Sequence, residues 1–161
     1  MMRYGGLIRD FDGTRSTPAP PCAGTFPSWT SWWGWNKEEP MEYHILAVGD
    51  VVGEPGLRHL EKNLRPLQKL KNIAFTVVNG ENASGVGVTP EQAWRIYDAG
   101  ADAVTLGNHT FGKKQLQALL DDVPWLLRPA NYTGRAPGHG CEIFDLGAVR
   151  VRVMNLSLIH I

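Results

Sequence analysis

Candidate metal-binding side chains follow three apolar, strand-like runs of the sequence. One run (residues 44–49) leads to an aspartate, the second (73–78) to a glutamate and an asparagine, and the third (103–107) to an asparagine and a histidine. The residues in these positions are Asp50, Glu81, Asn82, Asn108 and His109. Open α/β sheets hold ligands at the carboxyl ends of their strands, and carboxylate, amide and imidazole groups bind divalent metal ions. The pattern therefore predicts a metal-binding cluster at one edge of a sheet.

Three of these residues also have a purely structural explanation. A carboxylate at the end of a buried strand, such as Asp50, needs a cation, a helix-capping role or water, and the capping role is as good an explanation as a ligand role. Glu81 could bridge two cations or belong to an Asx turn, although Asn79 suits the turn better. An isolated His109 would best be explained as a core histidine, but its place beside Asn108 at a shared strand end favours a functional role.

Three segments have helical periodicity. Leucines recur from residue 57 to residue 70, with Pro66 expected to kink or divide that helix. Thr89 is a predicted N-cap, followed by a proline and a capping-box glutamine, and Gly100 is the expected stop. A third helix is predicted over about residues 113–120. These helices separate the strand-like runs.

The strands themselves suggest a mainly parallel sheet. A glycine-punctuated loop is expected at residues 49–56, and a short fourth strand at 125–127. Residues 141–146 and 149–156 form a predicted antiparallel pair. Strands that alternate with helices and then end in a hairpin indicate an α/β layered domain with a mainly parallel sheet.

Composition narrows the function classes. A length of 161 residues suits one domain. Sixteen basic residues balance sixteen acidic ones, so nothing in the net charge points to nucleic acid or to an anionic membrane. Cys22 and Cys141 have no metal-binding or redox spacing. Neither a membrane-spanning run nor a signal peptide is visible, so we expect a soluble, cytoplasmic protein.

Residues 1–40 differ from the remainder of the chain. They are rich in Pro, Gly, Ser and Trp and have neither helical nor strand periodicity. We predict that they form an irregular, disordered extension, that Met41 is the natural start, and that residues 41–161 hold the regular domain.

The combination of motifs is more specific than any single one. In order along the chain, the motifs are GDVVG (49–53), NGENA (79–83), GNHT (107–110) and RPANY (128–132). Together they resemble the YmdB-like metallophosphoesterases, a branch of the calcineurin-like phosphoesterase superfamily. The resemblance extends over about residues 43–155 and excludes residues 1–40. It implies a layered metallophosphoesterase fold.

The resemblance also implies a binuclear metal hydrolase that acts on small phosphodiesters such as 2′,3′-cyclic nucleotides. Asp50 would bind the first metal ion, Glu81 would bridge the pair, Asn82 would support the first site, and Asn108 would bind the second ion. His109 would lie beside the phosphate as a general acid or transition-state contact. Two cations about 3.5–4 Å apart clamp a phosphate and lower the pKa of bound water. Iron or manganese suits the mixed oxygen and nitrogen ligands.

Two departures from the superfamily pattern matter. Asp50 is followed by two valines instead of an Asp-x-His motif, which is usual for the YmdB-like branch. The family also supplies histidine ligands from a downstream half, and His160 does not lie in a matching motif. We therefore expect a truncated, N-terminal part of the fold with little or no activity of its own. The alternative is a non-catalytic nucleotide-binding or regulatory α/β module, which would bind no metal, whereas the enzyme needs two ions.

Overall fold

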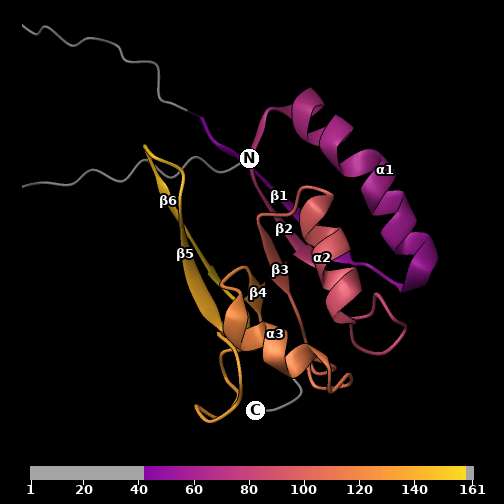
Figure 1. Ribbon diagram of the computed structural model, residues 1–161. Coiled ribbons are helices and arrows are strands. Elements are labelled where there is room, and N and C mark those ends of the chain that lie inside the picture. Colours follow the sequence, from indigo (N-terminus) through magenta and orange to yellow (C-terminus); the bar gives the residue numbers. More distant parts are fainter. Residues whose placement is uncertain (1–41, 159–161) are drawn as a thin grey trace, which may run out of the picture. The chain divides into compact units, whose positions relative to one another are not determined.

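A computed structural model describes residues 42–158 of the chain (Figure 1). The predicted extension at residues 1–40, Cys22 and His160 lie outside the described residues. Within the described part, no helix is both long enough and apolar enough to cross a membrane.

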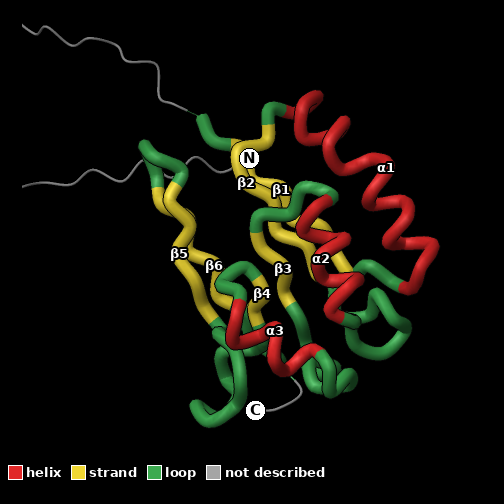
Figure 2. The backbone as a smooth tube through the Cα atoms, viewed as in Figure 1, coloured by secondary structure: helices red, strands yellow, loops and turns green. Residues whose placement is uncertain are grey.

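The main sheet has four strands, all parallel, in the order β1-β2-β3-β4. Their bounds are His44–Asp50, Ile73–Asn79, Ala103–Thr105 and Leu126–Leu127. A separate antiparallel pair follows, β5 (Cys141–Asp145) and β6 (Arg150–Met154). Figure 2 shows the strands in yellow. The predicted mainly parallel α/β sheet and the terminal hairpin are both confirmed.

The first helix, α1, runs over Gly53–Lys71 and corrects two predictions. The expected loop at residues 49–56 is wrong beyond residue 52, where the helix begins. Gly53 adopts the positive φ of 62° with which the chain enters the helix. Pro55 fits the first turn, because the amides there have no acceptor within the helix. Pro66 does not divide the helix. Pro66 has no N–H to donate to the carbonyl oxygen of Lys62. Because both residues are exposed, water can reach that oxygen.

Helix α2 (Pro90–Asp98) begins as predicted. The Thr89 hydroxyl accepts from the backbone N–H of Gln92 at 3.2 Å, and the Gln92 side chain accepts from the backbone N–H of Thr89 at 3.1 Å. The helix stops just before Gly100, whose φ is 119°. The third helix, α3 (Leu116–Asp122), starts three residues later than the expected start at residue 113. The capping residues of α2 therefore predicted the start of a helix more accurately than periodicity alone did for α3.

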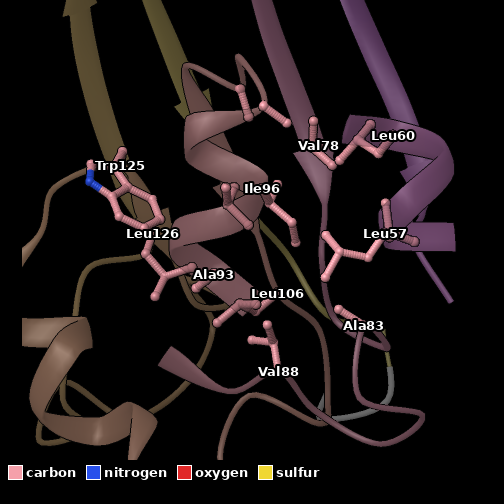
Figure 3. Packing of buried hydrophobic residues seen from close by; sticks show 14 of the residues in the cluster. Leu57, Leu60, Val78, Ala83, Val88, Ala93, Ile96, Leu106, Trp125 and Leu126 are labelled. Carbon is pink, nitrogen blue, oxygen red and sulfur yellow. The ribbon is translucent and has the colours of Figure 1, made fainter. Parts of the chain in front are cut away.

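The core lies between the sheet and helices α1 and α2. Figure 3 shows Val78 of β2 beside Leu57 and Leu60 of α1, with Ile96 of α2 close by, and all four are buried. Leucine periodicity overstated the buried face of α1, because Leu70 is 78% exposed. The packed helices thus cover one face of the strands whose ends carry the candidate ligands.

Asn155, just after β6, ties the end of the hairpin to the parallel sheet. Its side-chain amide donates to the carbonyl oxygen of Leu106 and, at 2.9 Å, to that of Leu127. Its backbone oxygen accepts from the amide of Ala130 at 2.8 Å, and its own amide donates to Gly140 at 3.0 Å. Asn155 therefore joins the ends of β3 and β4 to the segment that follows β6.

Asp102 gives the stability of this fold a predictable pH dependence. Its Oδ2 accepts from the backbone N–H of Thr76 at 2.7 Å. Burial raises the pKa of the Asp102 carboxyl, and the Thr76 hydrogen bond offsets part of the rise. A carboxyl whose pKa is higher in the folded state than in the unfolded state binds its proton more tightly when folded. Asp102 therefore favours folding below that pKa, and this contribution is lost as the pH rises through it.

Asp102→Asn keeps an oxygen acceptor for Thr76 and removes the titration. We expect the stability advantage of this variant over the wild type at pH 7 to shrink as the pH falls toward about 4. Thermal unfolding followed by circular dichroism across that range measures the difference, with the exposed Asp122→Asn as a matched control. Parallel curves for wild type and Asp102→Asn would contradict the assignment.

Candidate functional site

The carboxyl ends of β1, β2 and β3 meet at one edge of the sheet. Asp50 pairs in register with Asn79, and Asn79 pairs with Thr105. Because the three strands are parallel, the residues that follow them emerge on the same side. The structure thus places the elements that carry the candidate ligands where the sequence predicted them.

Asn82 connects a carboxylate to an imidazole. Its Nδ2 donates to Asp50 Oδ2 at 2.7 Å, and its Oδ1 lies 3.0 Å from His109 Nδ1. Since an amide oxygen only accepts, His109 Nδ1 must carry a proton in this contact. The hydrogen bond fixes the orientation of the imidazole ring and leaves Nε2 as its other functional nitrogen.

Glu81 also contacts His109. Its Oε1 accepts from the backbone N–H of His109 at 2.8 Å and lies 3.6 Å from His109 Nδ1. The Glu81 side chain is only 13% exposed, and Asn79 Oδ1 accepts from its backbone N–H at 2.9 Å. The Asx turn predicted for Asn79 is therefore confirmed. A carboxylate this buried gains most from a positively charged partner.

Gly107 forms a close backbone wall against the Glu81 carboxylate. A Cβ atom at Gly107 would collide with both carboxylate oxygens of Glu81 and would lie 2.5 Å from Oε1. Only a residue without a side chain allows this approach. The third strand end therefore holds Glu81 by shape as well as by the His109 hydrogen bond.

The donor set fits a divalent metal ion. Across residues 42–158, no group of three or more His, Cys, Asp and Glu side chains is placed to hold a metal ion. Within these residues, a metal ion would therefore take asparagine amide oxygens beside the carboxylates of Asp50 and Glu81. Two carboxylates, amide oxygens and one imidazole are the hard and intermediate ligands that manganese and ferrous iron accept. The Gly107 wall, which leaves room for the Glu81 carboxylate and for no side chain, is the structural feature that agrees best with a metal site.

Among the described residues, no hydrogen bond joins Asn108 to the cluster of Asp50, Asn82, His109 and Glu81. Asn108 lines a cavity of about 400 Å³, and four of the five predicted site residues are joined by hydrogen bonds without it.

Tyr132 also lines this cavity, and sequence reasoning assigned it no role. Its hydroxyl donates to the carbonyl oxygen of Gly107 at 3.3 Å. Burial raises the pKa of the Tyr132 hydroxyl, and the nearby Glu81 charge adds to the rise. Tyr132 belongs to the RPANY motif at 128–132. Its contact with the third strand end depends on the fold, so the motif alone did not predict it.

Gly107→Ala tests how much the wall positions Glu81. The added methyl group would meet the flexible end of the Glu81 side chain, so we expect the fold to persist with Glu81 displaced. The partly buried His109 N–H would lose its acceptor, at a cost of about 1–3 kcal/mol. Affinity for Mn²⁺ should fall at least about tenfold. Manganese titration followed by electron paramagnetic resonance measures the loss.

The matched control is Gly134→Ala, because a Cβ at Gly134 meets no atom within 4 Å. Wild-type manganese affinity in Gly107→Ala, with wild-type affinity in the control, would show that the wall has no positioning role.

Comparison with known proteins identifies a matching family. The family model described as YmdB-like protein matches residues 46–159. A protein of Bacillus subtilis named 2′,3′-cyclic-nucleotide 2′-phosphodiesterase is 44% identical over 115 residues, which cover 70% of this chain and 43% of the relative. The chain therefore spans less than half the length of this relative.

Two solved structures share the fold. A hypothetical protein from Thermus thermophilus superimposes with a TM-score of 0.63 at 31% identity, covering 70% of this chain and 44% of that one. A novel phosphatase from Mycoplasma pneumoniae gives a TM-score of 0.65 at 27% identity, covering 71% of this chain and 42% of that one.

Proposed function

The chain belongs to the YmdB-like protein family, and on this premise we propose that it serves metal-dependent hydrolysis of small phosphodiesters, with 2′,3′-cyclic nucleotides as the substrate class. The observation that carries the proposal is the hydrogen-bonded cluster of Asp50, Asn82, His109 and Glu81 at the carboxyl edge of the sheet.

The proposed ligand roles follow the positions of these side chains. Asp50 and the Asn82 amide oxygen would hold one metal ion, Glu81 would bridge to a second, and Asn108 would complete the second site. The oxygen-rich donor set favours manganese or iron. Bound divalent cations would supply a Lewis-acidic clamp for the phosphate and would lower the pKa of the attacking water.

His109 is the proposed general acid. Its contact with Asn82 keeps a proton on Nδ1, which would leave Nε2 as the nitrogen that acts on the substrate. For this role the ring would be doubly protonated. As a hydroxide ion, formed from water that has lost its proton to solvent, makes its bond to phosphorus, the bond from phosphorus to one ribose oxygen would break, and the Nε2 proton would pass to that oxygen. A positioned imidazole gives a rate advantage of about 10²–10⁴ for such a transfer.

The proposal is tested first by metal dependence. Mn²⁺ is titrated into the metal-free 161-residue chain, and hydrolysis of 2′,3′-cyclic AMP is followed by phosphorus NMR with and without EDTA. We expect hydrolysis to require Mn²⁺. It should be slow, because the hydrogen-bonded cluster contains one imidazole, whereas the family resemblance implies further histidine ligands from a downstream half. Hydrolysis that persists in EDTA would refute the metal mechanism. Nucleotide binding with no Mn²⁺ binding would instead identify a non-catalytic nucleotide-binding module.

A further inference from the structure

The cavity beside Asn108 carries no charge. It has a volume of about 400 Å³, within the range of sites for small ligands. The residues that line it are Asn108, Phe111, Asn131, Tyr132, Thr133 and Ala136. A phosphate group would meet no cation among these six described side chains. The cavity therefore suits a neutral part of a ligand.

Two aromatic rings that stack on each other line this cavity. The ring centroids of Phe111 and Tyr132 lie 5.8 Å apart, with 30° between the ring planes. Both side chains are partly buried, so their orientation is restrained while part of each ring is accessible. Stacking of a nucleobase on one aromatic side chain typically changes affinity by about 5- to 150-fold.

The same strand end forms the cavity and the proposed metal centre. Tyr132 donates to the carbonyl oxygen of Gly107, and a Cβ atom at Gly107 would meet the Glu81 carboxylate. Asn108, the next residue, lines the cavity and is a proposed metal ligand. A ligand whose phosphate lies at the cluster therefore has its neutral portion next to this cavity.

We infer that the cavity binds the heteroaromatic base of a nucleotide, with Phe111 and Tyr132 as the stacking surface. The orientation of the ligand rests on the proposed function, since that function places the phosphate at Glu81 and His109. Affinity for a base does not rest on the proposed function, because a base can bind in the cavity without a metal ion and without hydrolysis. Phe111 and Tyr132 are thus specificity-determining residues for the non-reacting part of the substrate.

The test uses adenosine, which has a base and no phosphate, as the probe. Heteronuclear NMR titration of the metal-free 161-residue chain should show adenosine-dependent shifts at Phe111 and Tyr132. Phe111→Leu keeps an apolar side chain and removes the ring, and we expect it to weaken adenosine binding at least about fivefold. Ribose 5-phosphate, which lacks the base, should not shift these residues.

Phe144→Leu is the matched control, because Phe144 is also partly buried against the core and lies on β5. It should bind adenosine as the wild type does. Tyr132→Leu provides a second test if Phe111→Leu folds poorly. Absence of adenosine binding, or equal affinity in the folded ring-deletion variants and the wild type, would overturn the inference.

The proposed hydrolysis can fail without affecting this result. Adenosine binding with no Mn²⁺-dependent turnover would refute the phosphodiesterase proposal and retain the base site. If turnover occurs, Phe111→Leu should raise KM for 2′,3′-cyclic AMP at least about fivefold with kcat unchanged, since stacking is equal in the ground and transition states. Unchanged KM would overturn the base site and leave the metal chemistry standing.

Discussion

Glu81→Gln should lower the affinity of the chain for Mn²⁺ by at least about 100-fold and reduce any Mn²⁺-dependent hydrolysis at least as much. Loss of an outer-shell partner costs about 10- to 100-fold in metal affinity, and loss of a charged ligand should cost more. Glutamine has nearly the shape of glutamate, so it can still pack against Gly107 and accept from the His109 N–H. The variant removes the charge while preserving the geometry.

Glu91→Gln is the control for this variant, because Glu91 is exposed in the first turn of α2. Both variants should unfold at nearly the wild-type temperature. Paramagnetic resonance of free Mn²⁺ then reports the two affinities. Equal Mn²⁺ binding by Glu81→Gln and the wild type would remove Glu81 from the metal site.

His109→Ala should reduce kcat for 2′,3′-cyclic AMP by about 10²–10⁴ while changing Mn²⁺ affinity much less. The contact that His109 makes with Glu81 Oε1 uses the backbone N–H, so it persists in the variant. The loss should therefore reflect the missing imidazole proton. A p-nitrophenyl phosphodiester has a leaving group that needs little protonation, so its hydrolysis should depend far less on His109.

The leaving-group comparison distinguishes acid catalysis from a structural defect. His139→Gln alters an exposed histidine in the loop before β5 and should leave both substrates unaffected. If His109→Ala slows both substrates equally, the imidazole contacts the phosphate or supports the fold and does not protonate the leaving group.

The sequence predicted the arrangement of strands because short-range signals agreed with the tertiary structure. Apolar runs bounded by polar or glycine residues became β1 and β2 nearly unchanged. The third strand is shorter than predicted: β3 stops at Thr105, two residues before Gly107. The start of α1 was missed because Gly53 and Pro55 are usual in loops, yet both fit a helix start.

The candidate site was predicted in composition but not in its contacts. Its residues follow strand ends, a property that the sequence pattern contains, and the predicted YmdB-like family and phosphoesterase fold are confirmed by the comparisons. The Gly107 wall against Glu81 and the contact of Tyr132 with Gly107 depend on the approach of segments far apart in the sequence. The metal ligand roles and the division at residue 40 stay predictions.

The bridge made by Asn155 determines how the site segment opens. Because its amide holds the carbonyl oxygens of Leu106 and Leu127, the turn bearing Asn108 and His109 is fastened at its base to the chain after β6. Local unfolding of that turn therefore includes release of the hairpin end, and the two segments form one cooperative exchange unit. Their amide protons should exchange with deuterium at a common opening free energy, higher than that of an ordinary surface loop.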